Sequence, residues 1–216
     1  MQVIHEIADF AAVAESIQRS VVQVRPDGVG GAGVVLMREG RPVVVTNAHV
    51  ARGEPGTPIL VVTYSGRVLE MQVERIDANR DLAVLTHNLL SVHREGAHLT
   101  PNPLSVNGEG ALLPATMGDI STVKPGHFVI AVGHPFGLAN AVTTGVVHAV
   151  GPIEQNLERA IGRRGLSWVQ ADIRLAPGNS GGPLCDTSGR VLGINTIVAG
   201  GLALAVPIAE LESLWA

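Results

Sequence analysis

Short apolar runs rich in Val, Ile and Leu alternate with turn residues from residue 21 to residue 85. The runs are four to nine residues long, and no segment with helical spacing lies between them. Six consecutive strands of this kind predict a closed antiparallel barrel. We expect its strands at residues 21–24, 33–37, 42–46, 59–63, 68–76 and 82–85.

A second series of apolar runs begins after residue 122 and has the same strand-like pattern. It contains a clear hairpin turn, Asp186-Thr187-Ser188-Gly189, between two of its runs. The pattern therefore predicts a second antiparallel barrel and an all-β protein. Its strands are expected at residues 128–132, 141–150, 167–171, 182–185, 191–197 and 202–206.

Both ends of the chain have the spacing of short helices. Ile7, Phe10, Ala14 and Ile17 recur at steps of three and four residues, and the segment after Pro207 fits a closing helix. We expect one domain over residues 1–216. Its parts are a helix at about 1–20, a first barrel at about 21–86, a connection at about 87–121, a second barrel at about 122–206 and a helix at 207–216.

The composition fits a globular protein and argues against several other classes. Hydrophobic residues make up 46% of the chain, and the net charge is −4 without a basic block, so nucleic acid is not an expected partner. Cys185 is the single cysteine, which excludes an intramolecular disulfide; we expect it to be buried.

No segment has the length and apolarity of a membrane-spanning helix, and the N-terminus lacks the basic and apolar regions of a secretory signal. We therefore expect no membrane span. The chain as written is expected to be cytoplasmic. If a leader precedes it in the native protein, the location would be periplasmic or secreted.

Ser180 lies in an unusual setting, the segment Pro177-Gly178-Asn179-Ser180-Gly181-Gly182. A serine hydroxyl becomes an effective nucleophile when a base takes its proton and backbone N–H groups stabilise the oxyanion. Glycines allow the backbone turn that aims two N–H groups at one point. The same segment is also typical of a surface turn, so it does not decide between the two alternatives alone.

A candidate base and a candidate carboxylate occur upstream, each beside a predicted strand. The chain order is His49, Asp81, Ser180, which is the order of the chymotrypsin triad. The segment 178–182 also satisfies the G-x-S-x-G pattern of α/β-hydrolases, but the last histidine is His148. Because that fold requires a histidine after the serine, the match is accidental.

Seven segments extend this comparison along nearly the whole chain. Together, and in this order, they resemble the trypsin-like serine proteases of the HtrA (Do/Deg) group. The segments are Gly30-Gly31-Ala32-Gly33-Val34-Val35, Val45-Thr46-Asn47-Ala48-His49-Val50, Arg80-Asp81-Leu82-Ala83-Val84-Leu85, Val132-Gly133-His134-Pro135-Phe136-Gly137, Thr143-Thr144-Gly145-Val146-Val147, Pro177-Gly178-Asn179-Ser180-Gly181-Gly182-Pro183-Leu184 and Gly193-Ile194-Asn195-Thr196.

The resemblance implies a chymotrypsin/trypsin-like double six-stranded antiparallel β-barrel and a serine endopeptidase that cuts unfolded or flexible polypeptides. It implies His49 as the base, Asp81 as its orienting group and Ser180 as the nucleophile, without a metal or cofactor. The oxyanion hole is expected at Gly178, Asn179 and Ser180. A catalytically silent peptide-binding pseudo-protease and an esterase with the same triad remain alternatives.

The pocket for the side chain before the scissile bond is expected between residues 174–177 and 194–199. Leu175, Ile194 and Ile197 favour a small aliphatic side chain, whereas Arg174 would favour an acidic one if it pointed inward. The remaining candidates, Asn195 and Thr196, form with Ile197 the strand expected to pair with the substrate backbone.

Two further expectations concern assembly. Proteases of this group usually continue into a peptide-binding PDZ domain, and we expect the protease domain alone here. The group commonly forms trimers through N-terminal segments, so the resemblance implies a homotrimer. Against this, Phe10 is the one aromatic residue among residues 1–20, which leaves the oligomeric state open.

Overall fold

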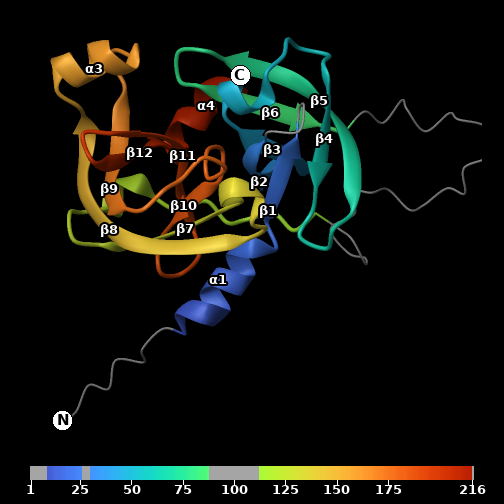
Figure 1. Ribbon diagram of the computed structural model, residues 1–216, viewed down its shortest axis with the longest axis horizontal. Helices are drawn as coiled ribbons and strands as arrows, with labels where there is room; N and C mark the ends of the chain where they lie inside the picture. Colours follow the sequence, from blue (N-terminus) through green and yellow to red (C-terminus); the bar gives the residue numbers. More distant parts are fainter. Residues whose placement is uncertain (1–8, 26–29, 88–111, 216) are drawn as a thin grey trace, which may run out of the picture.

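The apolar runs form two closed antiparallel barrels in the computed structural model, which describes residues 9–25, 30–87 and 112–215. The barrels lie beside each other (Figure 1). All twelve predicted strands are confirmed, with ends that differ by a few residues. The first barrel closes in the order β1-β2-β3-β6-β5-β4. Its strands are β1 (Val21–Arg25), β2 (Gly31–Arg38), β3 (Arg41–Thr46), β4 (Pro58–Val62), β5 (Val68–Asp77) and β6 (Leu82–Thr86).

The second barrel closes in the order β10-β11-β12-β9-β8-β7. Each barrel has a core of its own, made mainly of Val, Ile, Leu and Ala. A third apolar cluster joins the barrels: Leu36 and Val84 of the first share it with Trp168 and Leu204 of the second. This layer fixes the line along which the two barrels meet. The strands are β7 (Phe128–Gly133), β8 (Ala141–Pro152), β9 (Ser167–Ile173), β10 (Pro183–Cys185), β11 (Val191–Ala199) and β12 (Leu202–Pro207).

The helices are short and lie at the ends of the strands or of the chain. α1 (Phe10–Gln18) begins at Asp9, whose carboxylate accepts from the backbone N–H groups of Ala11 and Ala12. Residues 1–8 of the predicted first helix lie outside the described residues. The other helices are α2 (Ala48–Ala51), η2 (Ile120–Thr122), η3 (Pro135–Gly137), α3 (Gln155–Ile161), η4 (Ile208–Glu210) and α4 (Leu211–Trp215).

The connection between the barrels is described only from residue 112 onward. There the Ala115 N–H donates to Val35 O of the first barrel, at 2.8 Å. Three residues later, the Gly118 N–H donates to Val191 O of the second barrel, also at 2.8 Å. This segment therefore crosses from one barrel to the other. Residues 88–111 of the predicted connection lie outside the described residues.

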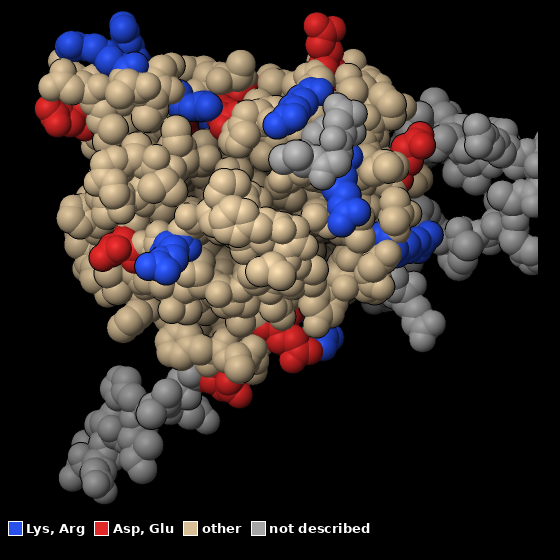
Figure 2. Space-filling model, in the orientation of Figure 1, with Lys and Arg blue, Asp and Glu red and all other residues tan. Residues whose placement is uncertain are grey.

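The surface and the cysteine agree with what the composition predicts. Figure 2 shows basic and acidic side chains in small groups around a largely uncharged face, without a broad basic patch on that face. Cys185 is confirmed as buried, and burial raises the pKa of its thiol well above the usual range. In the part of the chain that the structure describes, no helix has both the length and the apolar character needed to cross a bilayer.

Candidate active site

His49 and Asp81 face each other at the mouth of the first barrel. The sequence places His49 at a strand end, but β3 already ends at Thr46 and His49 lies in the single turn of α2. Its Nδ1 is 2.6 Å from Asp81 Oδ2, and its backbone N–H donates to Asp81 Oδ1 at 2.9 Å. A carboxylate acceptor at Nδ1 favours the tautomer with the proton on that nitrogen, which leaves Nε2 free to act as a base.

The turn that carries Asp81 is held in place by the ion pairs of the residue before it. Asp81 has a φ of +58°, in the left-handed region that Asp and Asn tolerate better than most residues. The preceding Arg80 forms ion pairs with Asp77 and Glu210, each at 2.8 Å. Asp81 itself is 4% exposed in its side chain, whereas His49 is 48% exposed. The carboxylate is thus buried beneath an accessible imidazole.

Asn47 supports the same pair from the interface between the barrels. Its Nδ2 donates to the backbone oxygen of Asp81 at 2.8 Å and to Thr196 Oγ1 of the second barrel at 3.0 Å. The side chain is fully buried. Sequence reasoning did not single out Asn47, although it stands two residues before His49 in one of the family segments.

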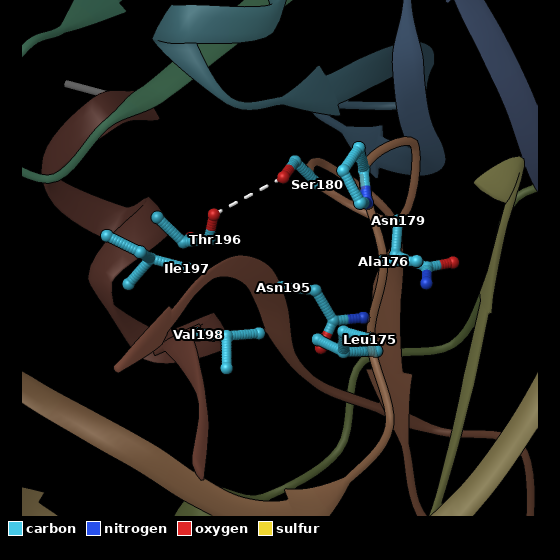
Figure 3. Close-up of a pocket in the computed structure, with 9 residues that line it drawn as sticks. Leu175, Ala176, Asn179, Ser180, Asn195, Thr196, Ile197 and Val198 are labelled. Carbon is cyan, nitrogen blue, oxygen red and sulfur yellow. Dashed lines mark hydrogen bonds between the residues drawn. The ribbon is translucent and has the colours of Figure 1, made fainter. Parts of the chain in front are cut away.

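Ser180 lies in the loop between β9 and β10, on the same interface. Its backbone oxygen accepts from Ala32 N–H of the first barrel at 2.8 Å, so the loop is fastened to both barrels. Its Oγ donates to the Thr196 carbonyl at 3.3 Å (Figure 3). In the described residues the hydroxyl has no hydrogen bond to His49. In free enzymes the hydrogen bond between nucleophile and base is often long or poorly aligned, and it tightens only when substrate binds.

The Thr196 carbonyl is available because of an irregularity in β11. The pairing with β12 shifts register between Asn195 and Ile197, which leaves Thr196 as the extra residue of a bulge. Bulges re-aim groups and interrupt pairing beside active sites. Here the bulge directs a main-chain acceptor toward the Ser180 hydroxyl.

The backbone around Gly178 leaves two N–H groups unpaired within the described residues, those of Gly178 and Ser180. Pro177 O accepts from Phe136 N–H and Gly178 O from His134 N–H, each at 3.0 Å. In a trans peptide the C=O and N–H point in opposite directions. The bond at Pro177 O therefore turns the Gly178 N–H away from η3.

Asn179 was also expected at the oxyanion hole, and this part of the prediction is wrong for its backbone donor. The Asn179 N–H already donates to Ala176 O at 3.0 Å. Asn179 therefore closes the turn, and the N–H groups of Gly178 and Ser180, on either side of it, are the ones without an acceptor in the described part of the chain.

His134 lies buried directly behind this loop. It is 5% exposed, its Nδ1 accepts from Asn140 N–H at 3.1 Å, and its backbone N–H holds Gly178 O. Burial penalises the charged ring and lowers the pKa of His134 to about 4, from an ordinary value of 6.5.

We expect this histidine to make the fold acid-sensitive. Between pH 6.5 and about pH 4 the ring of His134 is protonated in the unfolded protein, whose pKa is the ordinary 6.5, but neutral in the folded protein, whose pKa is about 4. Unfolding therefore takes up a proton in this pH range. The free energy of unfolding should fall by about 3 kcal/mol as the pH drops from 7 to 4. Urea unfolding at several pH values measures this. His134→Asn, which keeps an acceptor for Asn140, should flatten the curve; parallel curves for the two proteins would contradict the assignment.

A cavity of about 400 Å³ opens beside Ser180. Figure 3 shows Leu175 and Val198 below Ser180 and Thr196 around this space. Its lining is mainly apolar side chains and main chain from the Ser180 loop and from β11. The lining residues are Leu175, Ala176, Pro177, Asn179, Ser180, Asn195, Thr196, Ile197 and Val198.

Two of the predicted pocket residues do not line this cavity. Arg174 is exposed at the end of β9, and Ile194 is fully buried in the apolar cluster between the barrels. For Ile194 the reason is that successive side chains of a strand point to opposite faces, so Ile194 points away from the cavity that Asn195 lines. Ala176 and Val198 also line the cavity. Neither was a named candidate, but Ala176 lies within the expected segment 174–177 and Val198 within 194–199.

Comparison with known families decides the affiliation of this chain. The family described as "Trypsin-like peptidase domain" matches residues 31–194, a stretch that includes His49, Asp81 and Ser180. The chain belongs to the trypsin-like peptidase family. The two closed barrels confirm the predicted fold of this trypsin-like peptidase, and the HtrA names of its relatives confirm its HtrA-like character.

Three relatives of this trypsin-like peptidase illustrate the similarity. The mitochondrial serine protease HTRA2 of Drosophila virilis and that of Drosophila erecta are each 32% identical over 181 residues, which cover 82% of this chain and 37% of each relative. A solved structure described as the HtrA-type protease AlgW with tripeptide has a TM-score of 0.73 and 26% identity, over 94% of this chain and 61% of that one. The chain thus spans just over a third of the length of these curated relatives.

Proposed function

We propose that this chain is a serine endopeptidase that hydrolyses peptide bonds in unfolded or flexible polypeptides through an acyl-enzyme. The observation that carries the proposal is the His49–Asp81 pair at 2.6 Å, on the interface that also holds Ser180. The N–H groups of Gly178 and Ser180 lie on the same interface and have no partner among the described residues. A base, an orienting carboxylate, a nucleophile and oxyanion donors are the parts that acyl transfer requires.

The first step begins with a rotation of the Ser180 side chain. When its hydroxyl leaves the Thr196 carbonyl and turns to His49 Nε2, the imidazole can take its proton as Oγ attacks the peptide carbonyl. The Gly178 and Ser180 N–H groups then donate to the oxygen that becomes negative. The Thr196 carbonyl, freed at the same time, can accept an N–H of the substrate backbone.

The second half of the reaction reverses the proton transfer. The imidazolium, stabilised by Asp81, gives its proton to the leaving amine as the C–N bond breaks, which leaves the acyl group on Ser180 Oγ. A water molecule then attacks the ester while His49 takes one of its protons. Collapse of this second intermediate releases the acid and returns the proton to Ser180.

The apolar cavity supports a preference for a small aliphatic side chain before the scissile bond. Leu175, Ile197 and Val198 supply apolar walls, and none of the described residues that line the cavity of about 400 Å³ is charged. Because Arg174 is exposed and outside this lining, no cation among the described residues supports an acidic preference. Residues 195–197 of β11 are the proposed pairing strand for the substrate backbone.

The test is labelling with a fluorophosphonate probe, with Ser180→Ala as the matched control, beside assays on unfolded casein and on a simple ester. Labelling that depends on Ser180, together with casein cleavage, supports the proposal. No labelling would support a pseudo-protease. Labelling with ester turnover and intact casein would support an esterase. The homotrimer and the cellular location stay predictions.

A further inference from the structure

Arg163 reaches the triad carboxylate from an unexpected direction. It follows α3, in the connection between β8 and β9 of the second barrel, whereas Asp81 belongs to the first barrel. Its Nη2 lies 3.0 Å from Asp81 Oδ2, the same oxygen that lies 2.6 Å from His49 Nδ1. The same carboxylate oxygen thus faces both the imidazole and the guanidinium.

This contact differs from an ordinary surface ion pair because both partners are shielded from water. The Arg163 side chain is 18% exposed and that of Asp81 is 4% exposed. Arg163 Nε and Nη1 are also buried and have no hydrogen-bond partner among the described residues. Asp81 is therefore the group that compensates this charge, and a shielded pair interacts more strongly than an exposed one.

The local fold presents Arg163 in a defined way. α3 ends at Gly162, which has a φ of +72°, and the Arg163 N–H then donates to Glu158 O at 3.0 Å. Gly165 N–H donates to Glu158 Oε1, also at 3.0 Å, so the turn is bound to its own helix. Leu157 of the helix packs against the apolar cluster between the barrels. Figure 1 shows α3 beyond the ends of β8 and β9.

We propose that Arg163 is a positioning residue for the triad, which holds the Asp81 carboxylate against His49 and opposes the protonation of His49. This inference rests on the proposed function. With Oδ1 hydrogen-bonded to the His49 N–H and Oδ2 in an ion pair with Arg163, the carboxylate is held facing Nδ1. A cation on the same oxygen also repels a positive charge on the ring, so removal of this cation should favour the protonated ring.

Few other charges face this pair within the described residues. Arg52 contacts the backbone oxygen of His49 through Nε at 3.3 Å, and Arg80 is engaged by Asp77 and Glu210. Glu158, beside Arg163, uses its Oε1 on Gly165 N–H. Asp81 is thus the acidic side chain in contact with both His49 and Arg163.

The experiment compares Arg163→Gln and Arg163→Lys with Arg164→Gln, an exposed neighbour that removes the same charge outside the contact. The readout is kcat and KM for a peptide substrate from pH 5 to pH 9. We expect Arg163→Gln to move the acid limb of kcat upward by about one pH unit and to lower kcat about tenfold, with KM within about twofold. Arg163→Lys should keep most of the limb position, and Arg164→Gln should match the parent.

A second readout does not depend on turnover. In the Ser180→Ala protein, the ring proton signals of His49 followed by NMR against pH should show the Arg163→Gln midpoint about one unit above the parent. Unchanged midpoints and pH limbs in folded Arg163→Gln would overturn the inference, even if activity fell. Absent Ser180 labelling in the parent would instead contradict the proposed function, while the NMR comparison would still decide the role of Arg163.

Discussion

Asp81→Asn is expected to lower kcat about 10⁴-fold at neutral pH while the protein stays folded. Asn tolerates the left-handed backbone that this position requires, at a φ of +58°, so the turn before β6 can be kept. If the amide oxygen keeps the bond to the His49 N–H, the NH₂ group takes the place of Oδ2 and faces His49 Nδ1. An amide donor there forces the tautomer with its proton on Nε2, which cannot accept the serine proton.

The same exchange also places two donors against each other. Arg163 Nη2 lies 3.0 Å from the oxygen that the NH₂ group would replace. The guanidinium then loses the charge that compensates it among the described residues, in a shielded position, and we expect the segment after α3 to loosen. Asp81→Ala is a poorer test, because alanine is strained at positive φ and loss of the fold would lower activity by itself.

Steady-state kinetics and the rate of fluorophosphonate labelling measure the effect, with far-UV circular dichroism as the test of folding. Labelling should slow along with kcat, since both need His49 as a base. A folded Asp81→Asn protein that retained more than a tenth of the parent kcat would show that Asp81 does not orient His49.

The barrels could be predicted from the sequence because barrel strands have a repetitive physical signature. Each of the twelve strands is a short β-rich run between turn residues, and closure satisfies the edges of both sheets. His49, Asp81 and Ser180 could be named as well, because each stands in a local motif. Their chain order then separated the chymotrypsin architecture from that of the α/β-hydrolases.

The parts that escaped prediction depend on contacts between residues far apart in the chain. Nothing around Arg163 distinguishes it from Arg164, and only the folded turn after α3 buries one and exposes the other. The lining of the pocket beside Ser180 could not be predicted for the same reason. Arg174 and Leu175 are neighbours in sequence, and the direction of each side chain at the end of β9 decides which one lines the cavity. Spacing alone does not fix these directions where a strand ends.

Gly178→Ala is expected to lower kcat by about 10²–10³, with a much smaller change in KM. Gly178 has a φ of +107°, and a Cβ there would stand 2.2 Å from the backbone oxygen of His134 and 3.0 Å from Pro135 Cα. Both neighbours are backbone, so the Pro177–Gly178 peptide must move instead. Its N–H is one of the two donors that we propose for the oxyanion, and losing one such donor costs this much in turnover.

Gly126→Ala is the matched control, because it separates backbone strain from the clash. Gly126 has a similar φ of +90°, but a Cβ there meets nothing within 4 Å. We expect Gly126→Ala to lower stability by about 1 kcal/mol with kcat unchanged. Casein turnover and urea unfolding on both variants give the comparison. If Gly178→Ala lost only stability, as the control does, the loop would be a structural turn, and the oxyanion donors would have to be sought elsewhere on the interface between the barrels.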